Sequence, residues 1–174
     1  MFSGAFTALI TPFRNGEVDV EALESLVELQ ISQGIHGLVP CGTTGETPAM
    51  SEAEDRLVIE TVVRVSNGRV PVVAGSGSNS TEMAIKYTRM AQEAGADGSL
   101  QVSPYYNKPT QEGLYRHFAA IAESTDLPII LYNIPGRTAV TIEVATIARL
   151  AELPNVVGIK ESTLSMNVVS DIRS

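Results

Sequence analysis

The sequence predicts an α/β fold of the (β/α)8 TIM-barrel type, with about six βα units in the 174-residue chain. Short apolar runs rich in Val, Ile or Leu recur along the chain, and stretches with helical periodicity separate them. Continuous apolar strands that alternate with amphipathic helices are typical of a parallel sheet covered by helices. The spacing of the runs is close to the roughly 30 residues of a βαβ unit.

Six apolar runs are predicted to be strands, and they span residues 5–11, 37–41, 70–75, 98–103, 127–132 and 155–160. In the first helical stretch Leu23, Val27 and Ile31 share one face. Gly34 follows and marks the end of that helix, because glycine adopts the left-handed conformation that closes helices.

Four positions predict where later helices begin. Ser51 and Asn79 are each followed three residues later by a glutamate, which is the spacing of a capping box. Thr110 and Thr141 are expected to be the N-caps of the fourth and fifth helices.

A doubly wound sheet is the competing architecture. It would place a G-x-G-x-x-G turn after the first strand, but the first strand runs into TPFRNGEV, and GSGSNS after the third strand contains a single G-x-G. No P-loop motif occurs in the sequence. The barrel is therefore favoured, although a complete one needs about 250 residues.

The composition excludes several classes of partner. A formal net charge of −8 argues against a nucleic-acid groove or an anionic membrane surface. The single cysteine, Cys41, rules out an internal disulfide and is consistent with the cytoplasm. We expect no signal peptide and no membrane helix. His36 and His117 stand apart from other potential ligands, so no metal site is predicted.

Lys160 ends the sixth strand, at the edge where barrel active sites lie. With period-two alternation Val156, Gly158 and Lys160 share a face. If that face is the barrel interior, desolvation lowers the pKa of the amine and prepares it for a Schiff base with a carbonyl substrate. The alternative is a lysine that reaches solvent or pairs with Glu161.

Other strand ends are polar too. Tyr132 is either a proton shuttle for Schiff-base chemistry or an aromatic that fills the barrel. The GTTGE turn, with Thr43 and Thr44, is either a carboxylate holder or an ordinary turn. Arg137 either binds a second carboxylate or is a surface arginine. Tyr106 follows another tyrosine, and at most one of this adjacent pair is expected to face the site.

The motifs at these strand ends closely resemble the dihydrodipicolinate synthase family, the lysine-pathway branch of the pyruvate-dependent class I aldolases. The matching stretches are TPF (11–13), CGTTGE (41–46), SPYYNKP (103–109), QEGLYRHF (111–118), LYNIPGRT (131–138) and GIKES (158–162). They follow the order and spacing of the family from residue 1 to residue 174. The resemblance spans about the N-terminal three-fifths of a typical member.

The resemblance implies a role for each site residue. Lys160 forms a covalent imine (Schiff base) with pyruvate, and the reaction requires no separate cofactor. Tyr132 donates and accepts protons, and Thr43 and Tyr106 complete the relay. The tyrosine that matches Tyr106 reaches into the neighbouring subunit in the family.

The resemblance also implies two substrate-binding residues. Thr44 and its neighbouring backbone N–H groups hold the pyruvate carboxylate, and Arg137 binds L-aspartate-4-semialdehyde. The product is 4-hydroxy-tetrahydrodipicolinate, in lysine and diaminopimelate biosynthesis. A related keto-acid aldolase and a truncated, non-catalytic partial barrel are the alternatives.

Family members continue with two more barrel strands and a helical C-terminal domain. We therefore expect residues 1–174 to be a partial barrel that lacks these parts and is poorly stable and nearly inactive alone. A homodimer or homotetramer is expected for the full-length protein. Met83 stands where lysine-sensitive members have a glutamate, so weak inhibition by lysine is expected.

Overall fold

The computed structural model describes residues 2–163 and 165–173, and they form two compact units. The first unit contains the chain up to Gly75 together with Met90–Gly98. The second contains Ser76–Arg89 and the chain from Ser99 onward. Each unit is described by itself below.

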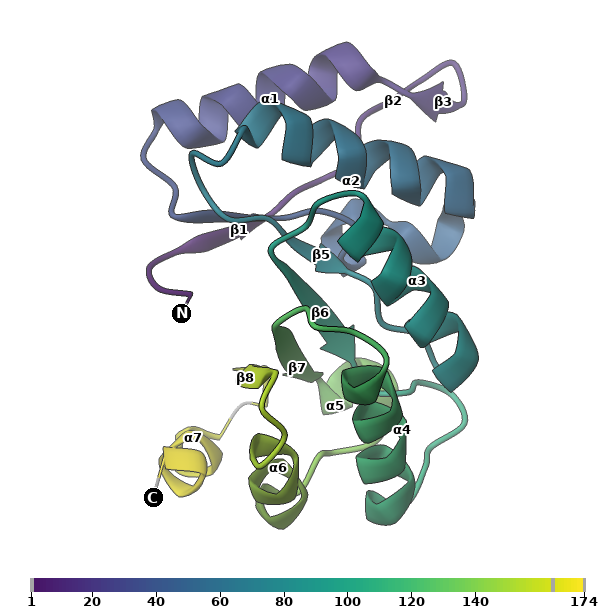
Figure 1. Ribbon diagram of the computed structural model, residues 1–174, viewed down its shortest axis with the longest axis vertical. Helices are drawn as coiled ribbons and strands as arrows, with labels where there is room; N and C mark the ends of the chain where they lie inside the picture. The colour runs from purple at the N-terminus through teal and green to yellow at the C-terminus, as the bar shows by residue number, and fades with distance from the viewer. Residues whose placement is uncertain (1, 164, 174) are drawn as a thin grey trace. The chain divides into compact units, whose positions relative to one another are not determined.

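The first unit begins with strands and two long helices (Figure 1). In chain order its elements are β1 (Phe6–Ala8), β2 (Phe13–Arg14), β3 (Glu17–Val18), α1 (Val20–Ser32), β4 (Gly37–Val39), the 3-10 turns η1 (Thr43–Gly45) and η2 (Thr47–Ala49), α2 (Glu52–Ser66) and β5 (Val73–Gly75). β1 pairs with β4 in parallel, with Phe6 opposite Gly37. Leu38 of β4 bridges in parallel to Val72, just before β5. β4 therefore pairs with β1 and also with the residue that leads into β5.

The two helices α1 and α2 pack against each other (Figure 1). Leu23 and Val27 of α1 are completely buried, as the helical periodicity predicted. The predicted capping box at Ser51 and Glu54 is confirmed, with both reciprocal hydrogen bonds present. Gly34 follows the C-cap of α1 with a φ of +84°, so its predicted role at the helix end is also confirmed.

A short hairpin was missed by the sequence analysis. β2 and β3 are antiparallel, with Phe13 opposite Val18. Asn15 and Gly16 connect them and have positive φ values of 55° and 86°. Asn-Gly is the residue pair preferred in a two-residue hairpin turn, because both positions need φ above zero. That signal was present in TPFRNGEV.

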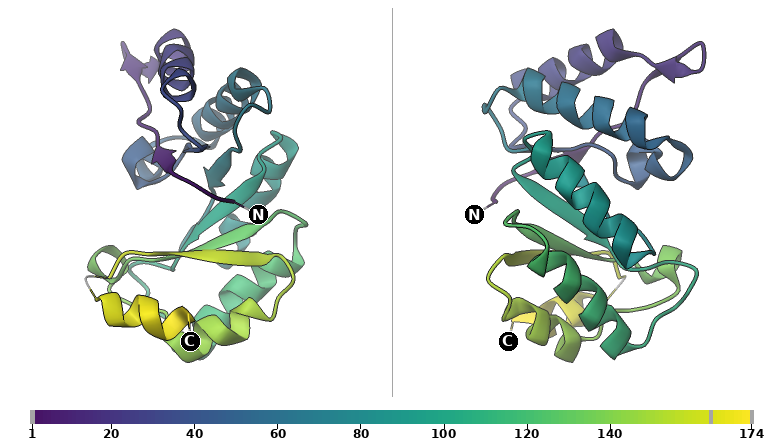
Figure 2. Two further views of the ribbon diagram at one scale, coloured as in Figure 1. Left: turned by 90° about the vertical axis from the view of Figure 1, so that its left-hand side faces the viewer. Right: turned by 45° about the vertical axis from the view of Figure 1, so that its right-hand side comes forward.

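The second unit contains a parallel sheet with helices (Figure 1). Two of its elements begin or end in the first unit: α3 (Thr81–Glu93) with its last residues and β6 (Gly98–Val102) with its first. The others are α4 (Gln111–Glu123), β7 (Ile129–Asn133), α5 (Pro135–Thr138), α6 (Val144–Ala151), β8 (Val156–Glu161) and α7 (Met166–Arg173). β6, β7 and β8 pair in parallel in chain order. α6 and α7 lie together on one side of β8 (Figure 2).

The core of this unit is apolar and continuous. Its fully or nearly fully buried members are Ala84, Leu114, Phe118, Ile121, Ala122, Ile129, Leu131, Ile142, Ile147 and Leu150. They come from α3, α4, β7, α6 and the segment before α6. The predicted N-cap Thr110 is confirmed, since its side chain accepts a hydrogen bond from the Gly113 N–H.

Two predicted caps were wrong. α3 begins at Thr81 and not after Asn79, because the Asn79 side chain donates to the Tyr105 carbonyl at 3.2 Å instead. The cap of α6 is Glu143 and not Thr141. The Glu143 N–H finds its acceptor on another helix, the Gln111 side chain of α4, at 3.0 Å. Both failures come from tertiary contacts that local spacing does not report.

Apart from the hairpin of β2 and β3, the strands in each unit pair in parallel with the next strand along the chain. A doubly wound sheet would reverse its strand order at one point, whereas a barrel adds each strand beside the last. Among residues 2–163 and 165–173, no helix has the length and apolar character needed to cross a membrane.

Candidate active site

Tyr132 and Lys160 lie at the carboxyl-terminal ends of neighbouring strands. The register of β7 and β8 places Tyr132 directly opposite Lys160. The Lys160 Nζ lies 4.2 Å from the centroid of the Tyr132 ring. A cation over an aromatic face at this distance is attracted by the negative face of the ring. Tyr132 is 7% exposed, so the amine of Lys160 lies against a buried aromatic ring.

The environment of Lys160 differs from the desolvated interior that the sequence suggested. Lys160 is exposed, because β8 pairs only with β7 among the described residues. Alternation was also interrupted: Ile129 pairs with Val156 and Ile130 pairs with Gly158. This bulge turns Val156 onto the core cluster together with Ile159. The prediction that Val156 shares a face with Lys160 was therefore wrong.

Asn133 and Glu161 tie the two strand ends together, and the sequence analysis missed this link. Asn133 is completely buried, and its Nδ2 donates to the Glu161 Oε2 at 2.8 Å. The Asn133 Oδ1 accepts the Ile142 N–H at 3.0 Å. The Glu161 Oε1 accepts the Thr163 N–H at 2.7 Å. The signal was a polar residue at the end of an apolar run, directly after Tyr132.

Arg137 lies in the single turn of α5, immediately after β7. Its backbone N–H donates to the Ile134 carbonyl at 3.0 Å, and its side chain is exposed. The next residue, Thr138, is 1% exposed and its hydroxyl contacts the Val140 carbonyl at 2.9 Å. The turn is thus anchored on one side and presents the guanidinium on the other.

Tyr106 projects from the loop after β6. It is 91% exposed and has a φ of +73°, a conformation that L residues with side chains rarely adopt. Asn107 and Asn79 hold the loop, because the Asn107 Nδ2 donates to the Asn79 carbonyl at 3.0 Å. Asn79 in turn donates to the carbonyl of Tyr105, so the strained backbone is held on both sides.

Thr43 and Thr44 lie in the first unit, at the start of η1, and both are exposed. Their N–H groups are the first two of the turn, which have no acceptor within the turn itself. Gly45 ends the turn, and its carbonyl accepts the buried Thr11 hydroxyl at 2.7 Å. The turn therefore presents hydroxyl and N–H donors together.

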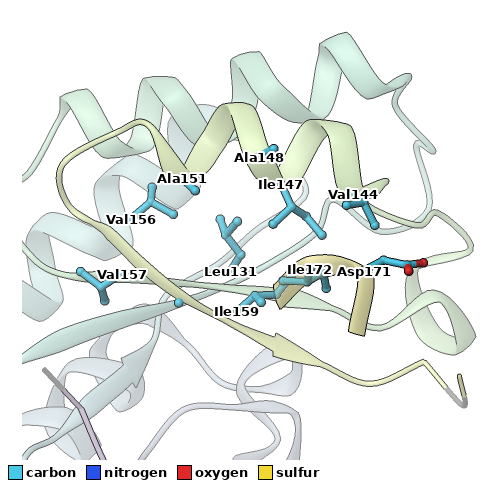
Figure 3. Close-up of a pocket in the computed structure, with 11 residues that line it drawn as sticks. Leu131, Val144, Ile147, Ala148, Ala151, Val156, Val157, Ile159, Asp171 and Ile172 are labelled. Carbon is cyan, nitrogen blue, oxygen red and sulfur yellow. The ribbon is translucent and has the colours of Figure 1, made fainter. Parts of the chain in front are cut away.

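An apolar pocket lies away from these residues, between β8, α6 and α7 (Figure 3). It has a volume of about 330 Å³ and is lined mainly by aliphatic side chains, including Leu131, Ile147 and Ile159. None of the six predicted site residues lines it. Among the described residues, no three His, Cys, Asp or Glu side chains gather in a way that would hold a metal ion.

The structure brings Lys160 and Tyr132 into contact, while Arg137 in α5 and Tyr106 in the loop after β6 belong to the same unit. Thr43 and Thr44 belong to the other unit. Successive parallel strands with a lysine and a phenol at their carboxyl ends are the arrangement of a (β/α)8-barrel protein with its site at the strand ends.

Comparison with known proteins gives the family. The model of the Dihydrodipicolinate synthetase family matches residues 1–174, and the chain belongs to this family. A 4-hydroxy-tetrahydrodipicolinate synthase of Rhodospirillum centenum is 62% identical over 163 residues, which are 94% of this chain and 56% of the relative. The chain thus spans little more than half the length of that relative.

Solved structures confirm the barrel-type fold. The dihydrodipicolinate synthase from Aquifex aeolicus superposes with a TM-score of 0.97 at 51% identity, over 98% of this chain and 59% of that one. The chloride-inhibited dihydrodipicolinate synthase from Acinetobacter baumannii, complexed with pyruvate, superposes with a TM-score of 0.96 at 48% identity. That match covers 99% of this chain and 61% of the A. baumannii chain.

Proposed function

We propose that this chain supplies the Schiff-base machinery of a 4-hydroxy-tetrahydrodipicolinate synthase, which condenses pyruvate with L-aspartate-4-semialdehyde. The observation that carries the proposal is the Lys160 Nζ over the Tyr132 ring, 4.2 Å from its centroid. Membership of the family and the pyruvate bound by the A. baumannii relative support the choice of substrate. The covalent imine makes a separate cofactor unnecessary.

The proposed reaction has three stages. The Lys160 amine adds to the pyruvate carbonyl, and loss of water gives an imine. Loss of a proton from the pyruvate methyl group gives an enamine, which forms a carbon–carbon bond with the aldehyde carbon of the semialdehyde. The amino group of the semialdehyde then displaces the lysine from the imine, which closes the ring and frees Lys160.

Proton transfer accompanies each stage, and Tyr132 is the proposed donor and acceptor. Its phenol lies opposite Lys160 in the strand register, which favours exchange of protons with groups on the amine. Thr43 and Tyr106 extend the relay in this proposal. The exposure of Tyr106 and its strained backbone support a role that reaches beyond its own subunit, and hence a homo-oligomer.

Two residues are proposed to bind carboxylates. Thr44 with the N–H groups of η1 holds the carboxylate of pyruvate, since backbone N–H groups at the start of a turn suit an anion. Arg137 binds the carboxylate of the semialdehyde, which an exposed guanidinium meets with two parallel hydrogen bonds. We also propose a cytoplasmic enzyme without nucleic-acid or membrane partners, and a whole protein completed by two further strands and a helical domain.

Borohydride trapping tests the proposal on the chain as it stands. With pyruvate present, reduction should leave a carboxyethyl group on Lys160, located by peptide mass spectrometry. Lys160→Arg, which keeps the charge without the nucleophile, should abolish the adduct. Tyr132→Phe keeps the ring beneath the ammonium but removes the phenol, and should slow trapping by about a hundredfold.

A folded chain that forms no adduct would instead favour a non-catalytic partial barrel. The exposure of Lys160 supports this alternative. Turnover of pyruvate with the semialdehyde in the whole protein separates the synthase from related keto-acid aldolases. There Arg137→Ala should raise the KM for the semialdehyde and leave the KM for pyruvate unchanged.

A further inference from the structure

Asp55 is a buried acidic residue that none of the proposed catalytic steps uses. It lies in the first turn of α2 and is 8% exposed. Its Oδ1 accepts a hydrogen bond of 2.6 Å from the Thr47 hydroxyl. Its backbone carbonyl accepts the Cys41 thiol, with the sulfur 3.6 Å from the oxygen. Cys41 precedes η1 and Thr47 follows it, so one residue of α2 binds both ends of the loop.

We propose that Asp55 is a positioning residue, which holds residues 41–49 in the shape that presents Thr43 and Thr44 to a carboxylate substrate. The inference rests on the proposed function, because it takes this loop as the pyruvate-binding element. Hydrogen-bond donors that are already fixed in place lose little conformational freedom when the substrate binds. The affinity for the substrate is therefore higher.

The loop needs such a restraint, because its backbone is strained at two points. Cys41 and Glu46 have φ values of +54° and +61°, in the left-handed region that non-glycine residues seldom occupy. Glu46 directly follows η1, and Gly42 alone separates Cys41 from its start. A free loop would relax toward ordinary backbone conformations and would turn the donors of Thr43 and Thr44 away from a common target.

The contacts of Asp55 act together with a third contact at the end of η1. The Thr11 hydroxyl donates to the Gly45 carbonyl at 2.7 Å. Thr11 belongs to the segment after β1, whereas Asp55 belongs to α2. The loop is thus held by two separate elements, and of Thr11 and Asp55 it is Asp55 that contacts both flanks of η1.

The protonation states suit these hydrogen bonds. Burial raises the pKa of the Cys41 thiol, so the sulfur keeps the proton that it donates. Burial also raises the pKa of Asp55, while the hydrogen bond from Thr47 lowers it. When Asp55 is ionised, the Thr47 hydrogen bond is charge-assisted and about twice as strong as a neutral one.

Amide hydrogen exchange tests the restraint. Thr47→Val removes the donor and keeps the branched shape, so the amides of Gly45 and Glu46, which donate within the turn, should exchange about tenfold faster. Asp55→Asn keeps a neutral acceptor, so its exchange rates should lie between those of the unchanged chain and of Thr47→Val. Ser51→Ala breaks the capping box of the same helix and should leave exchange in η1 unaffected.

Pyruvate trapping tests the functional part. In Thr47→Val the pyruvate concentration for half-maximal trapping at Lys160 should rise several-fold, while the maximal trapping rate stays unchanged. Thr47→Ser restores the hydroxyl and should restore the half-saturation. This split between binding and rate is not expected from a general loss of stability, which Ser51→Ala reproduces.

Two results would overturn the inference. One is faster exchange in Thr47→Val with no change in half-saturation, which would make Asp55 a purely structural residue. The other is unchanged exchange in Thr47→Val, which would show that η1 keeps its shape without Asp55. Absence of trapping in the unchanged chain refutes the proposed function instead, and the inference with it, and is recognised because it precedes any substitution.

Discussion

The buried histidine of α4 predicts how stability depends on pH. His117 is 5% exposed, and its Nδ1 lies 2.9 Å from the Thr81 hydroxyl. Its Nε2 has no hydrogen-bond partner among the described residues. Burial lowers the pKa of His117 from 6.5 to about 4, because placing a charge on a buried imidazole is unfavourable.

The size of the effect follows from this difference. At 1.36 kcal/mol per pKa unit, the shift from 6.5 to about 4 corresponds to about 3 kcal/mol. The unfolded chain binds the proton more readily than the folded one. The folded state therefore has its full stability above pH 6.5, and it loses stability progressively as the pH falls from 6.5 toward 4.

Urea unfolding between pH 7.5 and pH 4.5 measures this loss. Carboxylates whose pKa values are lowered by hydrogen bonds, such as Glu112 and Glu54, lose their contribution only below about 4.5. His117→Asn keeps an acceptor near Thr81 and should remove most of the slope, while His36→Asn, at an exposed position, should keep it. An unchanged slope in His117→Asn would refute the reasoning.

Two further predictions concern the loops and the glycines. Asn79→Ala removes a hydrogen bond that holds the strained loop, so chymotrypsin should cleave after Tyr106 several times faster. Asn167→Ala, at an exposed position of α7, is the control. Equal cleavage rates in the two variants would contradict the prediction. A Cβ at Gly75 would meet the backbone carbonyl of Cys41, so Gly75→Ala should lower the free energy of unfolding by about 2 kcal/mol or more. At Gly158 nothing lies within 4 Å of such a Cβ, and Gly158→Ala should change it by less than about 0.5 kcal/mol; similar losses at both sites would show that crowding is not the cause.

The strands and one capping box could be predicted from local pattern alone. Apolar runs bounded by turn residues predicted the six parallel strands but not the hairpin of β2 and β3, because burial on both faces of a parallel sheet leaves a continuous apolar signature. Ser51 and Glu54 satisfy each other within one turn, so their spacing was sufficient. Asn79 has the same spacing, yet its side chain serves a neighbouring loop, and the local rule failed.

The candidate site could be predicted only in part for a similar reason. The ends of the apolar runs placed Lys160 and Tyr132 at strand ends, and the register shows that they are opposite each other. The exposure of Lys160 depends on which strands flank β8. The residues near Lys160 in the sequence do not indicate which strands these are. The bonds of Asn133 and the two contacts of Asp55 join different elements of the fold, so the spacing within one helix or strand does not predict them.

The hydrogen bonds of the buried Asn133 amide fix the register between β7 and β8, the strand that carries Lys160. A slip of one residue between β7 and β8 would turn every β8 side chain to the opposite face. Lys160 would then point into the apolar helical layer, and Ile159 would point away from it. Such a slip would also break the bond from Asn133 to Glu161 while Ile142 holds the other end of the amide. One amide, which takes no part in the chemistry, thus selects the face on which the nucleophile lies.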